Sequence, residues 1–116
     1  ETGVDKTEFI NLIYTDGAIA GLFTTMESAT DRRGVIYGTK GYIEVDNINN
    51  YEAFRIYEND RRLVQTINCP AQISGYEYEV LACKRALEKG LTECPEMPHE
   101  HTLYIMRLFD EIRKSW

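Results

Sequence analysis

The stretch GVIYGTKGYIEVDN, residues 34–47, places β-branched and aromatic residues on either side of a short glycine-bounded turn. Such runs favour strands, and the glycines at both ends of Gly38-Thr39-Lys40-Gly41 suit a hairpin connection. The stretch therefore predicts two antiparallel strands. In this interpretation Gly38 and Gly41 supply the backbone conformations of the turn, and Lys40 lies in solvent.

Three kinds of binding loop have glycines at similar spacing, and the stretch fits each of them poorly. A P-loop requires Gly-Lys followed by Ser or Thr, whereas Lys40 precedes Gly41. A dinucleotide fingerprint lies between a strand and a helix, and no helix is predicted here. The turn does match the GXXG loop of KH domains, but that loop joins two helices. The structural turn is the favoured interpretation, and no nucleic acid is expected as a partner.

Four more segments have the composition of strands, and turn residues separate them. Asp16-Gly17 and Asn59-Asp60-Arg61 are the clearest of these turns. Tight connections imply antiparallel pairing. The predicted strands span residues 6–15, 18–26, 34–37, 42–46, 52–58 and 62–67.

The last third of the chain changes to a helical period. Ser74 and Glu77 have the spacing of a capping box, and Gly90 suits a left-handed C-cap. A helix is predicted over 76–89, and its apolar face holds Tyr76, Val80, Cys83 and Leu87. A second helix is predicted over 99–115, and its apolar stripe holds Ile105, Phe109, Ile112 and Trp116.

The expected fold is α+β, with one open, mainly antiparallel sheet of about six strands and two C-terminal helices packed on one of its faces. The chain has 116 residues, which fits a single domain over 1–116. Its net charge of −6 disfavours nucleic acid and anionic lipid as partners, and no apolar run is long enough for a membrane helix. Three cysteines without short pairwise spacing indicate free thiols and a cytoplasmic location.

Both faces of the first two predicted strands are apolar. A sheet with one face in water should alternate apolar and polar residues. Two helices can cover only one face of such a sheet, so we expect the other face to form a homodimer or a larger homo-oligomer. One face holds Phe9, Ile13, Ile19 and Phe23, and the other holds Ile10, Leu12, Leu22 and Met26.

The residues that could carry chemistry form no convincing constellation. Cys94, His99 and His101 are zinc-ligand types, but the two histidines lie two residues apart and point in different directions on a helix. A nucleophilic pair of Cys94 with His99, or of Cys83 with His101, lacks an oxyanion hole, and Cys83 is expected to be a buried, inert thiol. Possible acids are Tyr76, Tyr78 and Tyr104, for which packing is the simpler role. No catalytic, cofactor-binding or metal-binding residue is assigned.

Two segments in this order resemble a known family. VIYGTKGYIEV, followed by GYEYEVLACKRALEKGLTECPEMPHEHTLYIMRLFDEIRKSW, is similar to the C-terminal domain of Gfo/Idh/MocA oxidoreductases, and most of all to the dihydrodiol dehydrogenase-like branch. The hairpin from Ile36 to Ile43 and the two closing helices carry the resemblance. They span roughly residues 17–116.

The resemblance implies that this chain is the substrate-side and oligomerisation domain of an NAD(P)-dependent dehydrogenase that acts on a sugar, polyol or diol-type small molecule. The family binds NAD or NADP on an N-terminal Rossmann domain, whose glycine fingerprint is absent from this sequence, as is the family's Glu-Lys-Pro motif with the catalytic lysine. The chain by itself is therefore expected to bind no cofactor and to be inactive. In the family, helices cover one face of the sheet, and the other face forms dimer contacts and borders the active-site cleft.

An alternative function belongs to a different class. The chain would then be a stand-alone module that binds a ligand or a protein through the open face of the sheet.

Overall fold

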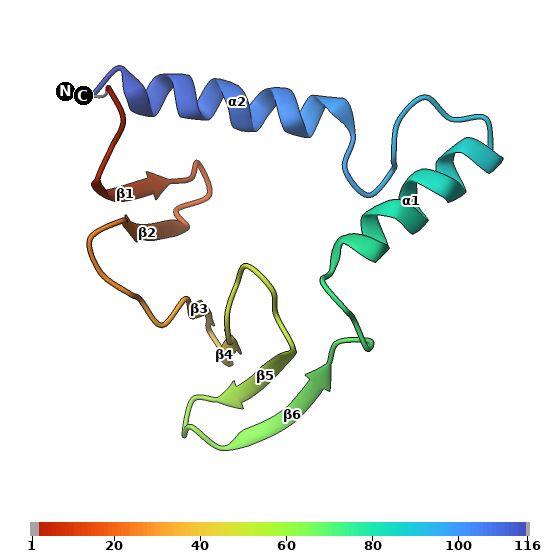
Figure 1. Cartoon of the computed structure of the whole chain (residues 1–116). Coiled ribbons are helices and arrows are strands. Elements are labelled where there is room, and N and C mark those ends of the chain that lie inside the picture. The colour runs from red at the N-terminus through yellow and green to blue at the C-terminus, as the bar shows by residue number, and fades with distance from the viewer. Residues whose placement is uncertain (1–2, 116) are drawn as a thin grey trace. The chain divides into compact units, whose positions relative to one another are not determined.

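The computed structural model describes residues 3–115 and shows six strands and two helices (Figure 1). The chain divides into two compact units. Glu1–Cys69 contains all the described strands, and Pro70–Trp116 contains both described helices. The predicted α+β class is thus confirmed. The packing of the helices on one face of a sheet stays a prediction.

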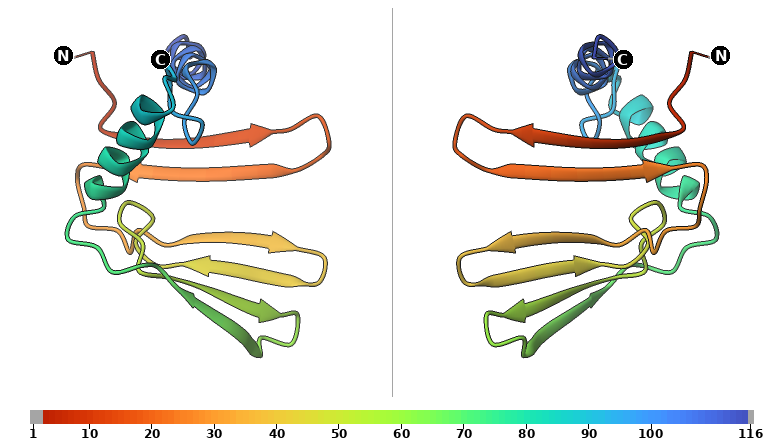
Figure 2. Two further views of the ribbon diagram at one scale, coloured as in Figure 1. Left: turned by 90° about the vertical axis from the view of Figure 1, so that its right-hand side faces the viewer. Right: turned by 90° about the vertical axis from the view of Figure 1, so that its left-hand side faces the viewer.

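All six predicted strands are present, and they form two open antiparallel sheets instead of one (Figure 2). One sheet pairs β1 with β2, and the other has the order β3-β4-β5-β6. The segment 26–33 separates β2 from β3 and contains mostly polar residues, which do not favour a strand. The bounds are β1 Thr7–Ile13, β2 Ile19–Thr25, β3 Gly34–Gly38, β4 Gly41–Val45, β5 Ala53–Glu58 and β6 Leu63–Asn68.

The turn between β1 and β2 confirms the Asp16-Gly17 signal, with a loop one residue longer than predicted. The N–H of Gly17 donates to the carbonyl of Tyr14 at 3.0 Å, and the N–H of Tyr14 donates to the carbonyl of Ala18 at 2.9 Å. Gly17 has φ 89°. This is a type I turn followed by a left-handed residue, a common three-residue hairpin loop.

The turn between β5 and β6 repeats this hydrogen-bond pattern with an arginine in the glycine position. The N–H of Arg61 donates to the carbonyl of Glu58 at 2.9 Å, and the N–H of Glu58 donates to the carbonyl of Arg62 at 3.0 Å. Arg61 has φ 68°, a conformation that costs a residue with a β-carbon about 1–2 kcal/mol. In both turns an aspartate carboxylate accepts a hydrogen bond from the backbone N–H of the residue two positions later. Asp16 accepts from Ala18, and Asp60 accepts from Arg62.

The glycines of the β3–β4 turn are not equivalent. A β-carbon on Gly41 would lie 2.0 Å from the carbonyl oxygen of Tyr57 on the neighbouring strand. A β-carbon on Gly38 would lie 3.5 Å from the carbonyl oxygen of Gly41, which is an ordinary contact. The expectation that both glycines are required is therefore confirmed for Gly41 only, and its reason is a close backbone approach from β5.

Helix α1 (Tyr76–Glu88) ends as predicted and begins with half of the predicted capping box. The carboxylate of Glu77 accepts hydrogen bonds from the N–H groups of Ile73 and Ser74. The hydroxyl of Ser74 donates to that same carboxylate and leaves the helix N–H groups uncapped. At the other end the N–H of Leu91 donates to the carbonyl of Ala86, and the N–H of Gly90 donates to the carbonyl of Leu87. These two hydrogen bonds form a Schellman motif.

Helix α2 (His99–Arg113) follows Pro98 directly. Its first N–H group, on His99, donates to the carboxylate of Glu93 at 2.7 Å. Trp116, which was predicted to extend the apolar stripe of this helix, lies outside the described residues. Within residues 3–115, no helix has the length and apolar character needed to cross a membrane.

Few side chains are buried. Among the described residues only Ala86 is buried, at 5% exposure. The apolar face predicted for α1 is exposed at Tyr76, Val80 and Leu87. Cys83 is also exposed, so the prediction that it is a buried thiol is wrong. Its sulfur faces another residue of the same unit, as described below.

We expect Gly41→Val to destabilise the four-stranded sheet by about 2–4 kcal/mol, because the new side chain cannot move away from the backbone of β5. Gly38→Ala is the matched control and should change the free energy of unfolding by less than about 1 kcal/mol. Lys40→Ala should have almost no effect. Urea denaturation measures all three, and equal losses at Gly38 and Gly41 would contradict the close-approach argument.

The start of α1 should weaken in acid. The backbone N–H of Ile73, with further hydrogen bonds, lowers the pKa of Glu77 from 4.5 to about 2. A carboxylate whose pKa is lower in the folded state contributes its full stabilisation above about pH 4.5 and loses it as the pH falls towards 2. Helix content followed by circular dichroism should therefore fall across this window. Glu77→Gln should remove most of that fall, whereas Glu79→Gln, in the same helical turn, should retain it.

Candidate functional site

The register of the four-stranded sheet separates its residues into two unlike faces. Ile36, Ile43 and Ile56 are neighbours across β3, β4 and β5, and Val45, Phe54 and Ile67 are neighbours across β4, β5 and β6. These six residues make this face largely apolar, with Gln65 beside Ile56 and Glu58 opposite Gly41 as its polar members. The opposite face, which we call the polar face, holds Arg33, Val35, Tyr37, Tyr42, Glu44, Asp46, Ala53, Arg55, Tyr57, Leu63, Thr66 and Asn68.

A row of tyrosines crosses one end of the polar face. Tyr42 pairs with Tyr37 on β3 and with Tyr57 on β5. The rings of Tyr42 and Tyr57 are stacked, with centroids 4.8 Å apart and planes inclined by 12°, and the Tyr37 ring lies 5.9 Å from that of Tyr42. Tyr37 is 79% exposed, so its ring is open to a ligand.

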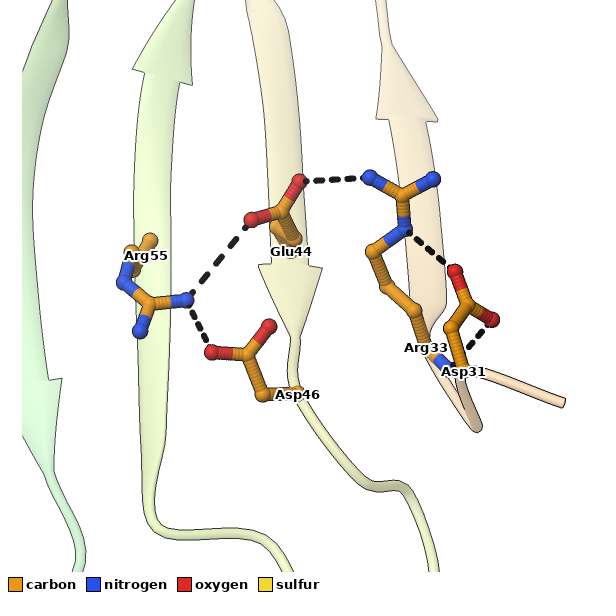
Figure 3. A network of polar contacts seen from close by, with 5 residues as sticks. All are labelled: Asp31, Arg33, Glu44, Asp46 and Arg55. Carbon is orange, nitrogen blue, oxygen red and sulfur yellow. Dashed lines mark hydrogen bonds and ion pairs between the residues drawn. The ribbon is translucent and has the colours of Figure 1, made fainter.

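An ion-pair network occupies the middle of the polar face (Figure 3). Glu44 on β4 lies between two arginines, 3.5 Å from Nη1 of Arg33 and 3.6 Å from Nη1 of Arg55. Arg55 also binds Asp46, and Arg33 binds Asp31 at 3.5 Å. These contacts connect the segment before β3 with β4 and β5.

The network holds two arginines and three carboxylates, so both positive charges are compensated. The hydrogen bond that Arg55 donates to Asp46 and the charge of that carboxylate raise the pKa of Arg55. Each arginine has carboxylate partners, so neither is a free anion receptor. The network fixes the sheet and offers polar edges to a neutral ligand, which suits recognition by hydrogen bonding more than proton transfer.

A hollow adjoins the network at the ends of β4, β5 and β6. Within it, the side-chain amide of Asn47 donates to the carbonyl of Asn50 at 3.3 Å. Its Oδ1 atom is buried and has no hydrogen-bond partner among the described residues. Such an oxygen is stabilised when a donor reaches it. The hollow is lined by Asp46, Asn47, Glu52, Ala53, Arg55, Thr66 and Asn68.

The β1–β2 ribbon presents a different kind of surface. Its register pairs Phe9 with Phe23 and Ile13 with Ile19, which confirms the predicted shared face. These four side chains are 65%, 55%, 80% and 73% exposed, respectively. We call them the ribbon face. Apolar side chains this exposed and this close together are typical of an interaction surface.

The GXXG segment lies where the sequence places it. Thr39 and Lys40 form the turn between β3 and β4, and the carbonyl of Thr39 accepts a hydrogen bond from the side-chain amide of Asn59 at 3.0 Å. Asn59 belongs to the β5–β6 turn, so the two turns are connected at one end of the sheet. The exposed Lys40 does not take part in this contact.

The segment with zinc-ligand types serves local structure. Glu93 caps α2, Glu96 binds Nη2 of Arg85 at 2.6 Å, and the Cys94 thiol donates to Cys83 Sγ at 3.8 Å. No group of three or more metal-ligand side chains occurs among residues 3–115. Cys83 and Cys94 are hydrogen-bonded to each other, and among the described residues neither forms a hydrogen bond to His99 or His101.

The candidate tyrosines of the helical unit show no shared site. The hydroxyl of Tyr78 donates to the carbonyl of Ala71 at 2.8 Å, while Tyr76 and Tyr104 are exposed. Sequence reasoning missed the row formed by Tyr37, Tyr42 and Tyr57. Its signal is a tyrosine at the same parity in three consecutive strands, which becomes meaningful once the register is known.

Comparison with known proteins finds no matching family model, no similar protein among those with curated descriptions and no matching solved structure.

Proposed function

We propose that this chain is the substrate-side and oligomerisation domain of an NAD(P)-dependent oxidoreductase of the Gfo/Idh/MocA type that acts on a sugar, polyol or diol-type substrate in the cytoplasm. The sequence resemblance supports the assignment to this family. The exposed ribbon face is the observation that supports the oligomerisation role, because a second apolar surface would cover it. The polar face is the part of the chain best suited to border a pocket for a polyhydroxyl substrate.

The residues present do not fit a dinucleotide site. The glycines of the β3–β4 turn lie between two strands, and Gly75 is the only glycine that immediately precedes a described helix. A pyrophosphate site needs several glycines between a strand and a helix N-terminus. The proposal therefore assigns the cofactor to a Rossmann domain encoded upstream, and no reaction step is derived from this chain.

The upstream reading frame tests the proposal most directly. Expression of the longer frame should yield a protein that reduces NAD⁺ or NADP⁺ when a sugar, polyol or diol substrate is supplied, measured by absorbance of the reduced nicotinamide. A frame without any Rossmann-type glycine fingerprint would contradict the proposal.

The alternative function is a stand-alone ligand- or protein-binding module, and one feature favours it. The stacked tyrosines, the ion-paired arginines and the unpartnered Asn47 oxygen all lie in or beside the four-stranded sheet and need no second domain to come together. Aromatic rings beside hydrogen-bonding groups are a common way to bind a small molecule.

The ribbon face should mediate self-association. We expect sedimentation equilibrium at tens of micromolar to show a dimer or a larger closed oligomer. Ile19→Lys places a charge on that face and should weaken association by at least about tenfold. Thr24→Lys is the control, because it adds the same charge to the opposite face of the same strand. A monomeric wild-type chain, or equal effects of both variants, would contradict this assignment.

The chain alone should not bind the cofactor. A titration of NADH or NADPH, followed by nicotinamide fluorescence, should show no saturable change, because the glycine fingerprint is absent. Micromolar binding would place the cofactor site within these residues, against the proposal.

A further inference from the structure

A thiol in the loop between the two helices lies close to a thiol on α1. The sulfur of Cys94 lies 3.8 Å from that of Cys83, which is on α1. Both cysteines are free. A disulfide needs the sulfurs to approach to about 2 Å, so oxidation requires the two sulfurs to move closer together.

Local contacts hold Cys94 in this position. A tight turn runs from Cys94 to Met97, with the N–H of Met97 donating to the carbonyl of Cys94 at 3.0 Å. Pro95 stands at the second position of this turn, which its fixed φ favours. The following residue, Glu96, binds Arg85, two residues after Cys83 on the same helix. These contacts keep the loop folded back along α1.

The beginning of the loop is anchored as well. The Schellman motif fixes Gly90 against Leu87 and Leu91 against Ala86, which is the one buried residue between residues 3 and 115. Glu93 accepts the N–H of His99 and connects the end of the loop to α2. The backbone on both sides of Cys94 is therefore anchored to the helices. This anchoring keeps the Cys94 thiol beside the Cys83 thiol.

We propose that Cys83 and Cys94 form a redox-active dithiol that oxidises to an intramolecular disulfide by exchange with a small disulfide such as glutathione disulfide. The proposal stands independently of the proposed oxidoreductase function. It gives these residues a role as a modification site that ties the interhelical loop to α1.

The exchange proceeds in two balanced steps. The Cys83 thiolate attacks one sulfur of glutathione disulfide, forms a mixed disulfide and releases one glutathione thiolate. The Cys94 thiolate then attacks the Cys83 sulfur and releases the second. The protein loses two protons and two electrons, and the oxidant becomes two glutathione thiols.

Exposure and hydrogen bonding decide the order of the two sulfurs. Cys83 is exposed and is reached by the oxidant, whereas Cys94 is half-buried. The hydrogen bond to Cys83, followed by burial, raises the pKa of the Cys94 thiol. Cys94 therefore keeps its proton until the mixed disulfide has formed, and it acts as the resolving cysteine.

The test is oxidation of the whole chain in a glutathione redox buffer, with free thiols trapped by an alkylating reagent and counted by intact mass. Alkylation of the wild type should fall from three sites to one, with Cys69 still labelled, and peptide mapping should join Cys83 to Cys94. Cys69→Ser should form the same bridge. Cys94→Ser should instead accumulate the mixed disulfide on Cys83.

A second measurement isolates the contribution of the folded loop. At one fixed glutathione ratio, the ratio of disulfide to dithiol should be at least roughly tenfold higher in buffer than in concentrated urea. Equal ratios would overturn the proposal, because the folded structure would then contribute nothing. A bridge that includes Cys69, or a wild-type mixed disulfide as persistent as that of Cys94→Ser, would overturn it too.

Discussion

The carbonyl oxygen of Tyr57 lies only 2.0 Å from where a β-carbon of residue 41 would be, and β4 can lie this close to β5 only because residue 41 is glycine. A shift of one residue would move every side chain of β4 to the other face. With Gly41 in place, Tyr42 lies opposite Tyr57 and Ile43 lies opposite Ile56. The separation of the sheet into an apolar face and a polar face therefore depends on a residue that contributes no side chain to either.

The polar face follows from that register. Glu44 and Arg55 are cross-strand neighbours and lie one row away from the stacked tyrosines. Arg33 joins from the segment before β3, so charges from three parts of the chain meet around one carboxylate. Since these contacts are partly exposed, each contributes little stability by itself, and their main effect is to order the surface beside the rings. An ordered surface of this kind loses less entropy when it binds a ligand.

The helices and strands could be predicted from sequence because they depend on local signals. The features that depend on long-range contacts could not be predicted. Asp16-Gly17 and Gly90 mark their turn and cap through backbone chemistry that depends only on neighbouring residues. The division into two sheets depends on whether β2 meets β3, which strand propensity cannot decide. The tyrosine row was equally hidden, because its rings meet only through pairing between strands. Cys83 was misjudged because helical periodicity shows which residues share a face and does not show what covers that face.

The segment from Glu93 to His99 shows how composition misleads until the distant partners are known. Its ligand-type residues invite a metal interpretation, yet the structure gives them separate roles as helix cap, turn and ion pair. The partners that decide these roles are Arg85 and Cys83, which lie on α1, two residues apart. Glu96 binds the first of them and Cys94 approaches the second, so both contacts hold the loop against the same helix. Each contact joins residues eleven positions apart in the chain, which is why the composition of the segment alone could not reveal these roles.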